Sequence, residues 1–459
     1  MHLGSIFRHC RGLLRAALLL AATGAPALAQ VAPATPFSMS TLYGFAGGTD
    51  AAFPQYVTLA IDGKGALYGT SQYGGSNGLG AVFKLTPPGF GQTAWTETVI
   101  HSFSSADGAA PLAGLIFDSQ GSLYGTTLRG GASANCPGGC GTAFKLTPPV
   151  TPAAPWTFTT IFNSDIGTTG STLLGGLVFD GLGALYGSAV QGGFYGGGVV
   201  YQLTPSGLGQ WTSAAIYNFS GADGGFPSST LITDTSGALY GTTSFGGPAG
   251  AGVVFKLMRS GTGCTPVTPN LWCQTVLYAF TGGVDGGSAF GGVVMDKSGA
   301  LYGATKNGGT YNFGVIFKLT PPATQWTQTT LYTFTGGKDG ATSFGPLTLA
   351  GGALYGTTAY GNGGGCGGNG CGALFQLRPP AAPATNWTLA TLHGFSGAAD
   401  GGNPLGGLAF GALGYGFGAA VYGVTSYGGA NGLGTIFALQ CAHPAREVFG
   451  GAQHVACAQ

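Results

Sequence analysis

The sequence predicts an all-β fold, a seven-bladed β-propeller whose blades are four-stranded antiparallel sheets. A Leu-Tyr-Gly-Thr motif recurs at intervals of 53 to 67 residues, which indicates a repeat architecture. Its seven copies begin at Leu67, Leu123, Leu185, Leu239, Leu301, Leu354 and, in degenerate form, Val421. Each repeat also holds four short apolar segments separated by turn signals, and no segment has a helical hydrophobic period over a useful length.

The first repeat illustrates the division into strands. Its apolar segments are residues 57–62, 67–70, 81–86 and 95–103, and Pro87-Pro88 ends the third because proline cannot donate to a β-ladder. Radial repetition of such units leaves only short, protected sheet edges, which favours a propeller. The alternative is a β-solenoid, whose coils are usually shorter than this repeat and lack the four-strand division.

The order of segments in the second repeat resembles the blades of kelch-type propellers. Its segments are 114–118, 123–127, 142–146 and the Trp-led 156–162. The resemblance implies that the Trp-led strand is outermost in each blade. Residues 37–45 then form an outer strand with no inner strands before them, and the last repeat ends at residues 435–439 without an outer strand. We therefore predict that the N-terminal strand closes the seventh blade, since unpaired edges are unfavourable.

The stretch 37–439 also resembles the GloVer-type tandem-repeat proteins, which are exported bacterial proteins. The shared unit is an aromatic-Tyr-Gly-Thr-Thr segment, a Gly-Gly loop and a Val-Phe-Lys-Leu segment. The resemblance implies a location outside the cytoplasm and supplies no activity. It often brings a C-terminal anchor, and residues 441–459 do not have the expected apolar tail followed by basic residues.

The composition limits the classes of function. Of 459 residues only 6% are charged, 92 are Gly and 44% are hydrophobic. Regularly placed apolar residues argue for a packed core rather than disorder, and Gly suits the many tight turns. The formal net charge is +1 and no basic stripe is present, which argues against a nucleic-acid partner.

The first 29 residues are typical of a secretory signal peptide. Arg8, Arg11 and Arg15 precede and enter the apolar run 16–22, and small residues 27–29 precede a cleavage site after Ala29. The run is shorter than the about 20 residues that span a bilayer. We expect residues 1–29 to be the signal peptide, 30–36 a linker, 37–440 the propeller and 441–459 a tail. The mature chain should be secreted or periplasmic, monomeric and without a transmembrane segment.

Eight cysteines outside the signal peptide fall into four local pairs. We predict disulfides joining Cys136 to Cys140, Cys264 to Cys273, Cys366 to Cys371 and Cys441 to Cys457. Four thiolates could instead hold zinc. In a seven-bladed ring the first and third pairs are three blades apart, too far for one metal to bind four sulfurs at about 2.3 Å.

Every Asp occupies one of two slots in the repeat. The first slot is an Asp-x-x-Gly turn, which we interpret as structural, at Asp62, Asp118, Asp180, Asp234 and Asp296. The second slot joins one blade to the next, and a ring of its carboxylates could bind cations or polyol hydroxyls near a channel mouth; a repeated turn cap is the simpler explanation. It holds Asp50, Asp107, Asp223, Asp285, Asp339 and Asp400, with Asp165 as a shifted copy.

Other residues give no catalytic constellation. Six Trp residues at a fixed place suggest blade packing rather than sugar stacking, and His101 and His393 stand where other repeats have Tyr. Glu97 and Glu447 are the only Glu residues, and symmetric repeats do not naturally supply the two differing acids of a hydrolase. The Gly-x-Gly sequences lack the strand–helix context of a phosphate-binding loop. No cofactor and no metal are expected.

Two functions remain. The first is a binding or scaffold module at the cell envelope or outside the cell, whose partner is an extracellular glycan or another envelope protein. The second is a carbohydrate-active enzyme, a polysaccharide lyase or hydrolase, using the Asp residues of the second slot. A purely structural envelope repeat is a further possibility. In each case we expect the Gly-rich loops, whose sequences vary between blades, to provide the contact surface.

Overall fold

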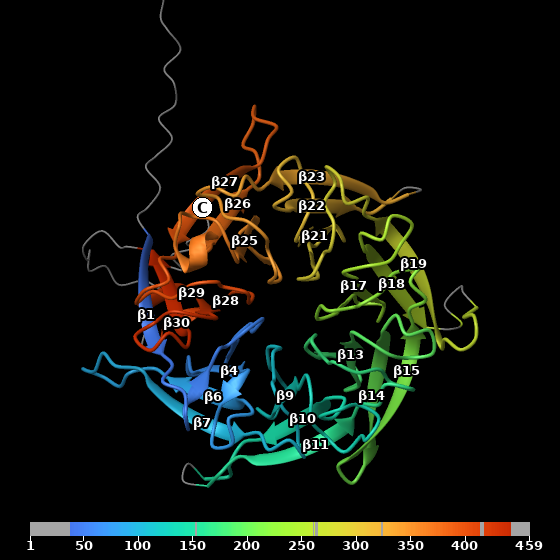
Figure 1. Cartoon of the computed structure of the whole chain (residues 1–459), viewed down its shortest axis with the longest axis horizontal. Coiled ribbons are helices and arrows are strands. Elements are labelled where there is room, and N and C mark those ends of the chain that lie inside the picture. The colour runs from blue at the N-terminus through green and yellow to red at the C-terminus, as the bar shows by residue number, and fades with distance from the viewer. Residues whose placement is uncertain are drawn as a thin grey trace, which may run out of the picture. The chain divides into compact units, whose positions relative to one another are not determined.

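Seven four-stranded antiparallel sheets follow one another around a common centre (Figure 1). The computed structural model describes residues 37–441 except 152–153, 260, 262–264, 323–324 and 414–416. The predicted signal peptide and linker, and the tail beyond residue 441, lie outside the described residues. Within the described part the seven-bladed propeller is confirmed.

The strands of each blade run from the inner to the outer strand in the following order. Blade one is β3 (Ala60–Ile61), β4 (Leu67–Ser71), β6 (Ala81–Thr86) and β7 (Thr96–Ser102). Blade two is β8 (Ile116–Phe117), β9 (Leu123–Thr126), β10 (Thr142–Thr147) and β11 (Thr157–Asn163). Blade three is β12 (Val178–Phe179), β13 (Leu185–Ala189), β14 (Val199–Gly207) and β15 (Gln210–Asn218). Blade four is β16 (Ile232–Thr233), β17 (Leu239–Thr242), β18 (Val253–Arg259) and β19 (Trp272–Ala279).

The remaining blades have the same order. Blade five is β20 (Val293–Met295), β21 (Leu301–Ala304), β22 (Val315–Thr320) and β23 (Thr327–Thr333). Blade six is β24 (Thr348–Ala350), β25 (Ala353–Thr358), β26 (Ala373–Arg378) and β27 (Thr388–Gly394), with a short 3₁₀ turn η1 (Cys366–Gly368). Blade seven is β28 (Ala409–Leu413), β29 (Phe417–Thr425), β30 (Thr435–Cys441) and β1 (Phe37–Gly44). A two-residue ribbon joins β2 (Ala51–Ala52) to β5 (Tyr73–Gly74).

The N-terminal strand closes the ring. β1 pairs antiparallel with β30, from Phe37 opposite Cys441 to Gly44 opposite Thr435. The sheet order β1-β30-β29-β28 makes β1 the outer strand of blade seven. This confirms the predicted closure, and it leaves no inner strand without a partner on its outward side.

The Leu-Tyr-Gly-Thr motif packs each blade against the next. A Cβ at Gly125 would lie 2.6 Å from Cζ of Phe144 and 2.7 Å from Cδ2 of Leu115, so only glycine fits beneath that ring. The Thr126 hydroxyl donates to the carbonyl oxygen of Gly175 in blade three at 3.1 Å. Equivalent bonds to the following blade are made by Thr70, Ser188 and Thr357. The motif is therefore an architectural unit.

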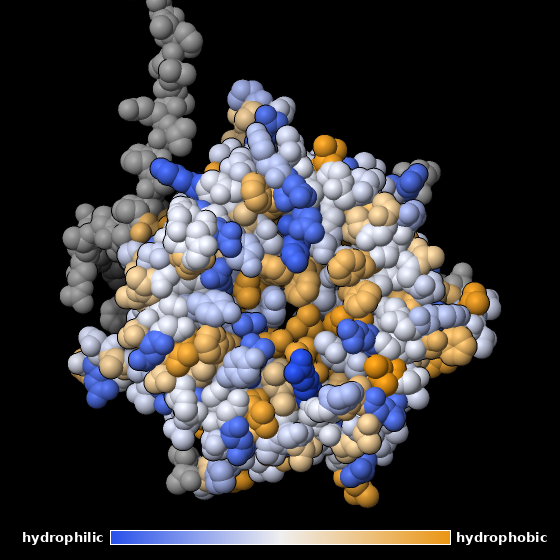
Figure 2. Space-filling model, in the orientation of Figure 1, coloured by the Kyte–Doolittle hydropathy of each residue, from blue (hydrophilic) through white to orange (hydrophobic). Residues whose placement is uncertain are grey.

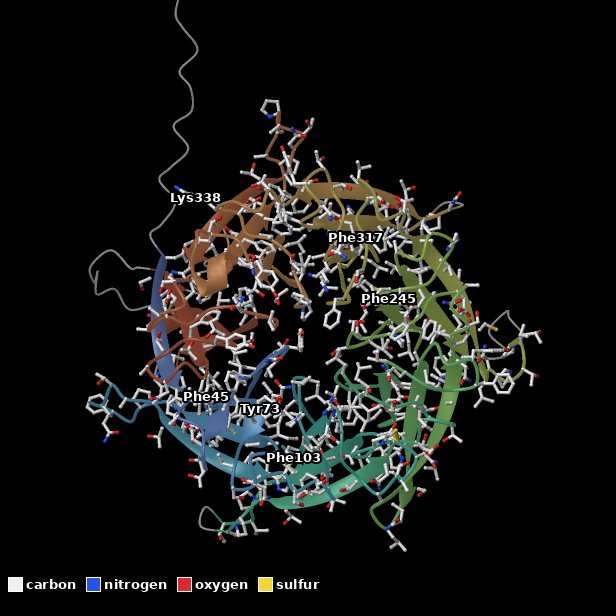
Figure 3. The ribbon with its side chains drawn as sticks, in the orientation of Figure 1. Phe45, Tyr73, Phe103, Phe245, Phe317 and Lys338 are labelled. Atoms are coloured by element: carbon white, nitrogen blue, oxygen red, sulfur yellow. A yellow bond between two sulfur atoms is a disulfide. The ribbon has the colours of Figure 1, made fainter. Side chains whose placement is uncertain are left out.

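The hydrophobic core lies between neighbouring blades. The Phe that follows an outer strand stacks edge-on against the Phe of the third strand of the next blade, as in Phe45 with Phe83 at 5.2 Å and Phe280 with Phe317 at 5.1 Å (Figure 3). The same contact recurs at the pairs 103/144, 219/255 and 334/375, and the rings of the pair 395/437 are tilted at 57°. Aromatic contacts of this geometry add about 0.5–1.5 kcal/mol each beyond the burial of area.

One residue per blade has a left-handed backbone and links neighbouring blades. Thr172 has φ of 66°; its amide donates to Cys140 O of blade two at 3.0 Å, and its carbonyl accepts from Val190 N of its own blade at 3.1 Å. The equivalent residues are Phe53, Ala110, Phe226, Ser288, Thr342 and Asn403. Because a positive φ is unfavourable for these residues, the two hydrogen bonds must hold it in place.

Candidate functional site

The blade-to-blade connections and the Gly-Gly loops share one rim, which we call the loop rim. Gly131 N donates to Ser105 O at 2.8 Å, and Gly75 N donates to Asp50 O at 2.9 Å. Hydrogen bonds of this kind recur in the other blades, so the prediction that these loops lie together is confirmed. The Asp-x-x-Gly turns lie at the opposite rim near the Pro-Pro segments, with Gly121 beside Pro148.

The second-slot carboxylates hold the ends of the outer strands. Asp285 Oδ2 accepts from the Tyr278 hydroxyl at 2.9 Å and from Thr281 N at 2.8 Å. Asp107 and Asp400 have a histidine in place of the tyrosine, at 3.1 and 3.0 Å. The same arrangement surrounds Asp50, Asp223 and Asp339. The two histidines therefore replace tyrosine as partners of a carboxylate.

These hydrogen bonds favour the ionised form of the carboxyl group in the turn. Although burial opposes ionisation, bonds from Thr281 and Tyr278 lower the pKa of Asp285, while burial and the Asp285 carboxylate raise the pKa of Tyr278 to about 12. The shifted copy, Asp165, accepts from Ser133 and Asn135 of the preceding blade. Ligand binding by the second-slot residues stays a prediction; the Tyr or His partners of the other six lie on outer strands.

The first-slot Asp residues form the tight turn before the motif. Asp118 Oδ1 accepts from Gln120 N at 2.9 Å and Ser122 N at 2.8 Å, and Oδ2 accepts from the Tyr124 hydroxyl at 3.1 Å. Lys145 Nζ lies 3.6 Å from the same carboxylate. This geometry supports the structural interpretation of the slot. The tyrosine of the motif thus has a hydrogen-bonding partner as well as a packing role.

The seam between blades seven and one contains a second acid. Glu97 on β7 faces Asp50, and its Oε1 is buried without a hydrogen-bond partner among the described residues. In blade four the equivalent residue is Gln274, whose Nε2 donates to Asp223 O at 2.7 Å. Burial and the Asp50 carboxylate raise the pKa of Glu97 to about 8. Burial and the neighbouring carboxylate therefore favour the protonated form of this side chain.

The centre of the ring holds an apolar cavity of about 280 Å³. Its lining comes from the segments that begin all seven blades, includes Tyr56, Phe290 and Phe344, and contains no Asp or Glu. These three rings meet across the channel, with centroids 5.2 to 6.0 Å apart. Burial, with the nearby Tyr360 and Tyr427, raises the pKa of Tyr56. We call Tyr56, Phe290 and Phe344 the channel cap.

A ring of seven exposed side chains lies on the loop rim, each immediately before a Gly-Gly loop or its equivalent. The backbone of each pairs with the segment that leads into the first strand of its own blade. This rim ring consists of Tyr73, Arg129, Gln191, Phe245, Asn307, Tyr360 and Tyr427. Its four aromatic members are 38 to 56% exposed. Tyr73 and Phe245 lie on opposite sides of the centre (Figure 3), and apolar residues gather around that centre (Figure 2).

Neighbouring aromatics support the rim ring. Phe53 lies between Tyr73 and Tyr427, at centroid distances of 5.9 and 5.4 Å, and Phe226 lies 5.4 Å from Phe245. The sequence analysis did not single out these residues. When the repeats are aligned at the Gly-Gly loop, the position just before it holds an aromatic residue, an amide residue or Arg129.

The Trp residues serve blade packing, as predicted. Trp156 lies 6.0 Å from Tyr68 of the neighbouring blade, and Trp272 lies 5.6 Å from Tyr186 and is 6% exposed. The tryptophans therefore occupy the gaps between outer parts of adjacent blades. Exposed aromatic side chains lie instead in the rim ring and on neighbouring loops, for example at Phe194 and Tyr311.

Two predicted disulfides are confirmed. Cys136 is bonded to Cys140 and Cys366 to Cys371, with Cα atoms 5.1 and 5.2 Å apart. Cys273 is also disulfide-bonded, and its predicted partner Cys264 lies outside the described residues. The predicted Cys441–Cys457 bond involves a side chain and a residue that are likewise not described. Both confirmed bonds shape loops on the loop rim.

The site contains no obvious metal centre. Over residues 37–441, leaving aside the undescribed gaps, no three His, Cys, Asp or Glu side chains converge to hold an ion. Over the same residues, no helix has the length and apolar character needed to cross a bilayer.

Comparison with known proteins places the chain. No curated protein sequence matches it. Among solved structures, a putative oxidoreductase (glucose dehydrogenase) from Thermus thermophilus is 13% identical with a TM-score of 0.44, covering 88% of this chain and 100% of its own. A putative 6-phosphogluconolactonase from Bacteroides uniformis is 12% identical with a TM-score of 0.43, covering 73% and 83%. Such distant resemblances transfer no activity.

The repeat itself gives a closer relationship. The model of the Gloeobacter/Verrucomicrobia repeat matches residues 17–149 and 132–368, which together span most of the chain. The matched stretch contains the first six copies of the motif whose packing role is described above. The chain therefore belongs to the Gloeobacter/Verrucomicrobia repeat family.

Proposed function

We propose that this protein is an exported binding module that holds a glycan on its loop rim. The observation that carries the proposal is the rim ring, where four exposed aromatic rings surround the channel cap. Exposed aromatic faces stack on apolar faces of sugar rings, and the amides of Gln191 and Asn307 offer donors and acceptors to hydroxyl groups. Solvent-exposed aromatic surface on a rim also marks an interaction site.

The known chemistry of the rim supports binding more than catalysis. Each second-slot carboxylate accepts hydrogen bonds from its own turn and from a Tyr or His. The acid pair described above, Glu97 with Asp50, lies at the seam between blades seven and one, where the Asp50 carboxylate already accepts from the Tyr43 hydroxyl and the Ala46 amide; glycoside hydrolysis needs two acids that flank one scissile bond. Export is supported by the confirmed disulfides. N-terminal sequencing of the protein recovered outside the cytoplasm tests cleavage after Ala29.

The binding test uses purified protein and a panel of cellulose, xylan, chitin, dextran, alginate and polygalacturonate. We expect at least one glycan to bind without release of soluble fragments. Tyr427→Ala should weaken binding about tenfold, since losing one stacked ring removes about 1.4 kcal/mol. Phe90→Ala is the matched control, because Phe90 is 97% exposed on the loop between β6 and β7. Fragment release would support the enzyme instead, and binding to no glycan would refute the proposal.

A further inference from the structure

One ammonium group lies over the channel cap. Lys306 follows β21, and its Nζ is 5.1 Å from the centre of the Phe344 ring. Its backbone is fixed because Lys306 N donates to Ser288 O at 3.0 Å. The side chain is only partly exposed. A cation held against an aromatic face at this distance is favourably placed, and it keeps capacity to donate hydrogen bonds.

The loop rim carries both cationic and acidic side chains, which differ in their partners. In the described part of the chain neither Lys306 nor Arg129 forms an ion pair. The negative charges are the second-slot carboxylates, whose Tyr and His partners belong to the outer strands. The lining of the central cavity has no acidic residue. Over the channel cap, Lys306 therefore carries a positive charge without an ion-pair partner among the described residues, whereas the second-slot carboxylates are hydrogen-bonded to outer strands.

We propose that the glycan is acidic, with a carboxylate on its sugar rings that binds Lys306 over the channel cap. This inference rests on the proposed function, since it names the class of ligand for the same surface. The sugar rings stack on the aromatic members of the rim ring, and the carboxylate accepts from the Lys306 ammonium, which makes no ion pair among the described residues. The three rings of the channel cap meet across the channel, so the polysaccharide lies across the rim rather than through it.

The test compares each acidic polymer with its own neutral ester. Polygalacturonate, alginate and hyaluronan are measured against their methyl esters by titration calorimetry, which keeps the sugar backbone constant. We expect at least one acid form to bind about tenfold more tightly than its ester, with a preference that falls between 50 and 300 mM salt because charge attraction is screened.

Variants assign the preference to the proposed residue. Lys306→Gln should remove most of the difference between acid and ester without changing binding of the ester, and Lys306→Arg should keep the difference. Lys338→Gln is the control, because Lys338 lies at the periphery of the ring (Figure 3). Near-ultraviolet circular dichroism checks that each variant is folded.

The outcomes separate the two proposals. If acid and ester bind equally, or if Lys306→Gln keeps the full preference, the acidic ligand is refuted and the binding module stands. If the neutral and acidic glycans of both panels all fail to bind, the proposed function is refuted and the inference falls with it.

Discussion

Glu97 gives the sharpest test of how the ring is closed. Replacing it by Gln keeps the shape of the protonated acid and removes the ionisable group. Blade four already has Gln274 at the equivalent position, where its amide donates to the preceding connection. We therefore expect Glu97→Gln to be tolerated and to stabilise the protein at alkaline pH.

The sign follows from the pKa of Glu97, which burial and Asp50 raise from 4.5 to about 8. A group that is more basic in the folded protein binds protons on folding, so its contribution is fully present below about pH 4.5 and is lost as the pH rises through about 8. Each pKa unit corresponds to about 1.4 kcal/mol. Because the carboxyl group is partly exposed and solvent screens it, we expect a difference of about 1–2 kcal/mol rather than the full value.

The assay is urea unfolding of the wild type and Glu97→Gln between pH 4.5 and 9. The two proteins should have similar free energies of unfolding at pH 4.5, and the variant should be more stable at pH 9. Gln274→Glu is the reciprocal variant, which should lose stability as the pH rises because it places an acid beside Asp223. A difference between wild type and Glu97→Gln that stays constant over the whole pH range would refute the reasoning.

Three further predictions concern the repeat. Thr126→Val removes the inter-blade hydrogen bond and should lower the free energy of unfolding by about 1–3 kcal/mol in urea, because it leaves a buried carbonyl oxygen without its donor; an unchanged midpoint would contradict the role given to the motif. Gly125→Ala should cost about 1–3 kcal/mol by overpacking, whereas Gly63→Ala, with no atom near the new methyl group, should be nearly neutral in the same measurement. Cys136→Ser should lower stability by about 2 kcal/mol through loss of a small loop, and a reduced wild type of equal stability would argue against it.

Much of the fold could be predicted from the sequence because every repeat carries the same pattern of strand and turn segments. Turn signals and the Leu-Tyr-Gly copies define the strands, and the unmatched strand 37–45 implies how the ring closes. The hydrogen-bonding partners of the second-slot Asp residues were harder to predict from the sequence. The contact of Asp107 with His101, for example, depends on the conformation of the loop between them. The variable loops that carry Arg129, Gln191 and Asn307 were expected to form the contact surface, but the aromatic members of the rim ring were missed because a search for repeated residues passes over Tyr73 and Phe245.

The pairing of β1 with β30 has a consequence for how the molecule can be re-engineered. Because the first and last described strands are hydrogen-bonded neighbours, the blade they share is completed by chain from both ends. A circular permutant that begins after residue 44, with 37–44 joined behind β30, would keep every strand pair and need only a hairpin to connect them. Adding or deleting a single repeat is a different case, because the angle between every pair of neighbouring blades would have to change for the ring to close. The repeat number of this protein is therefore a property of the whole circle.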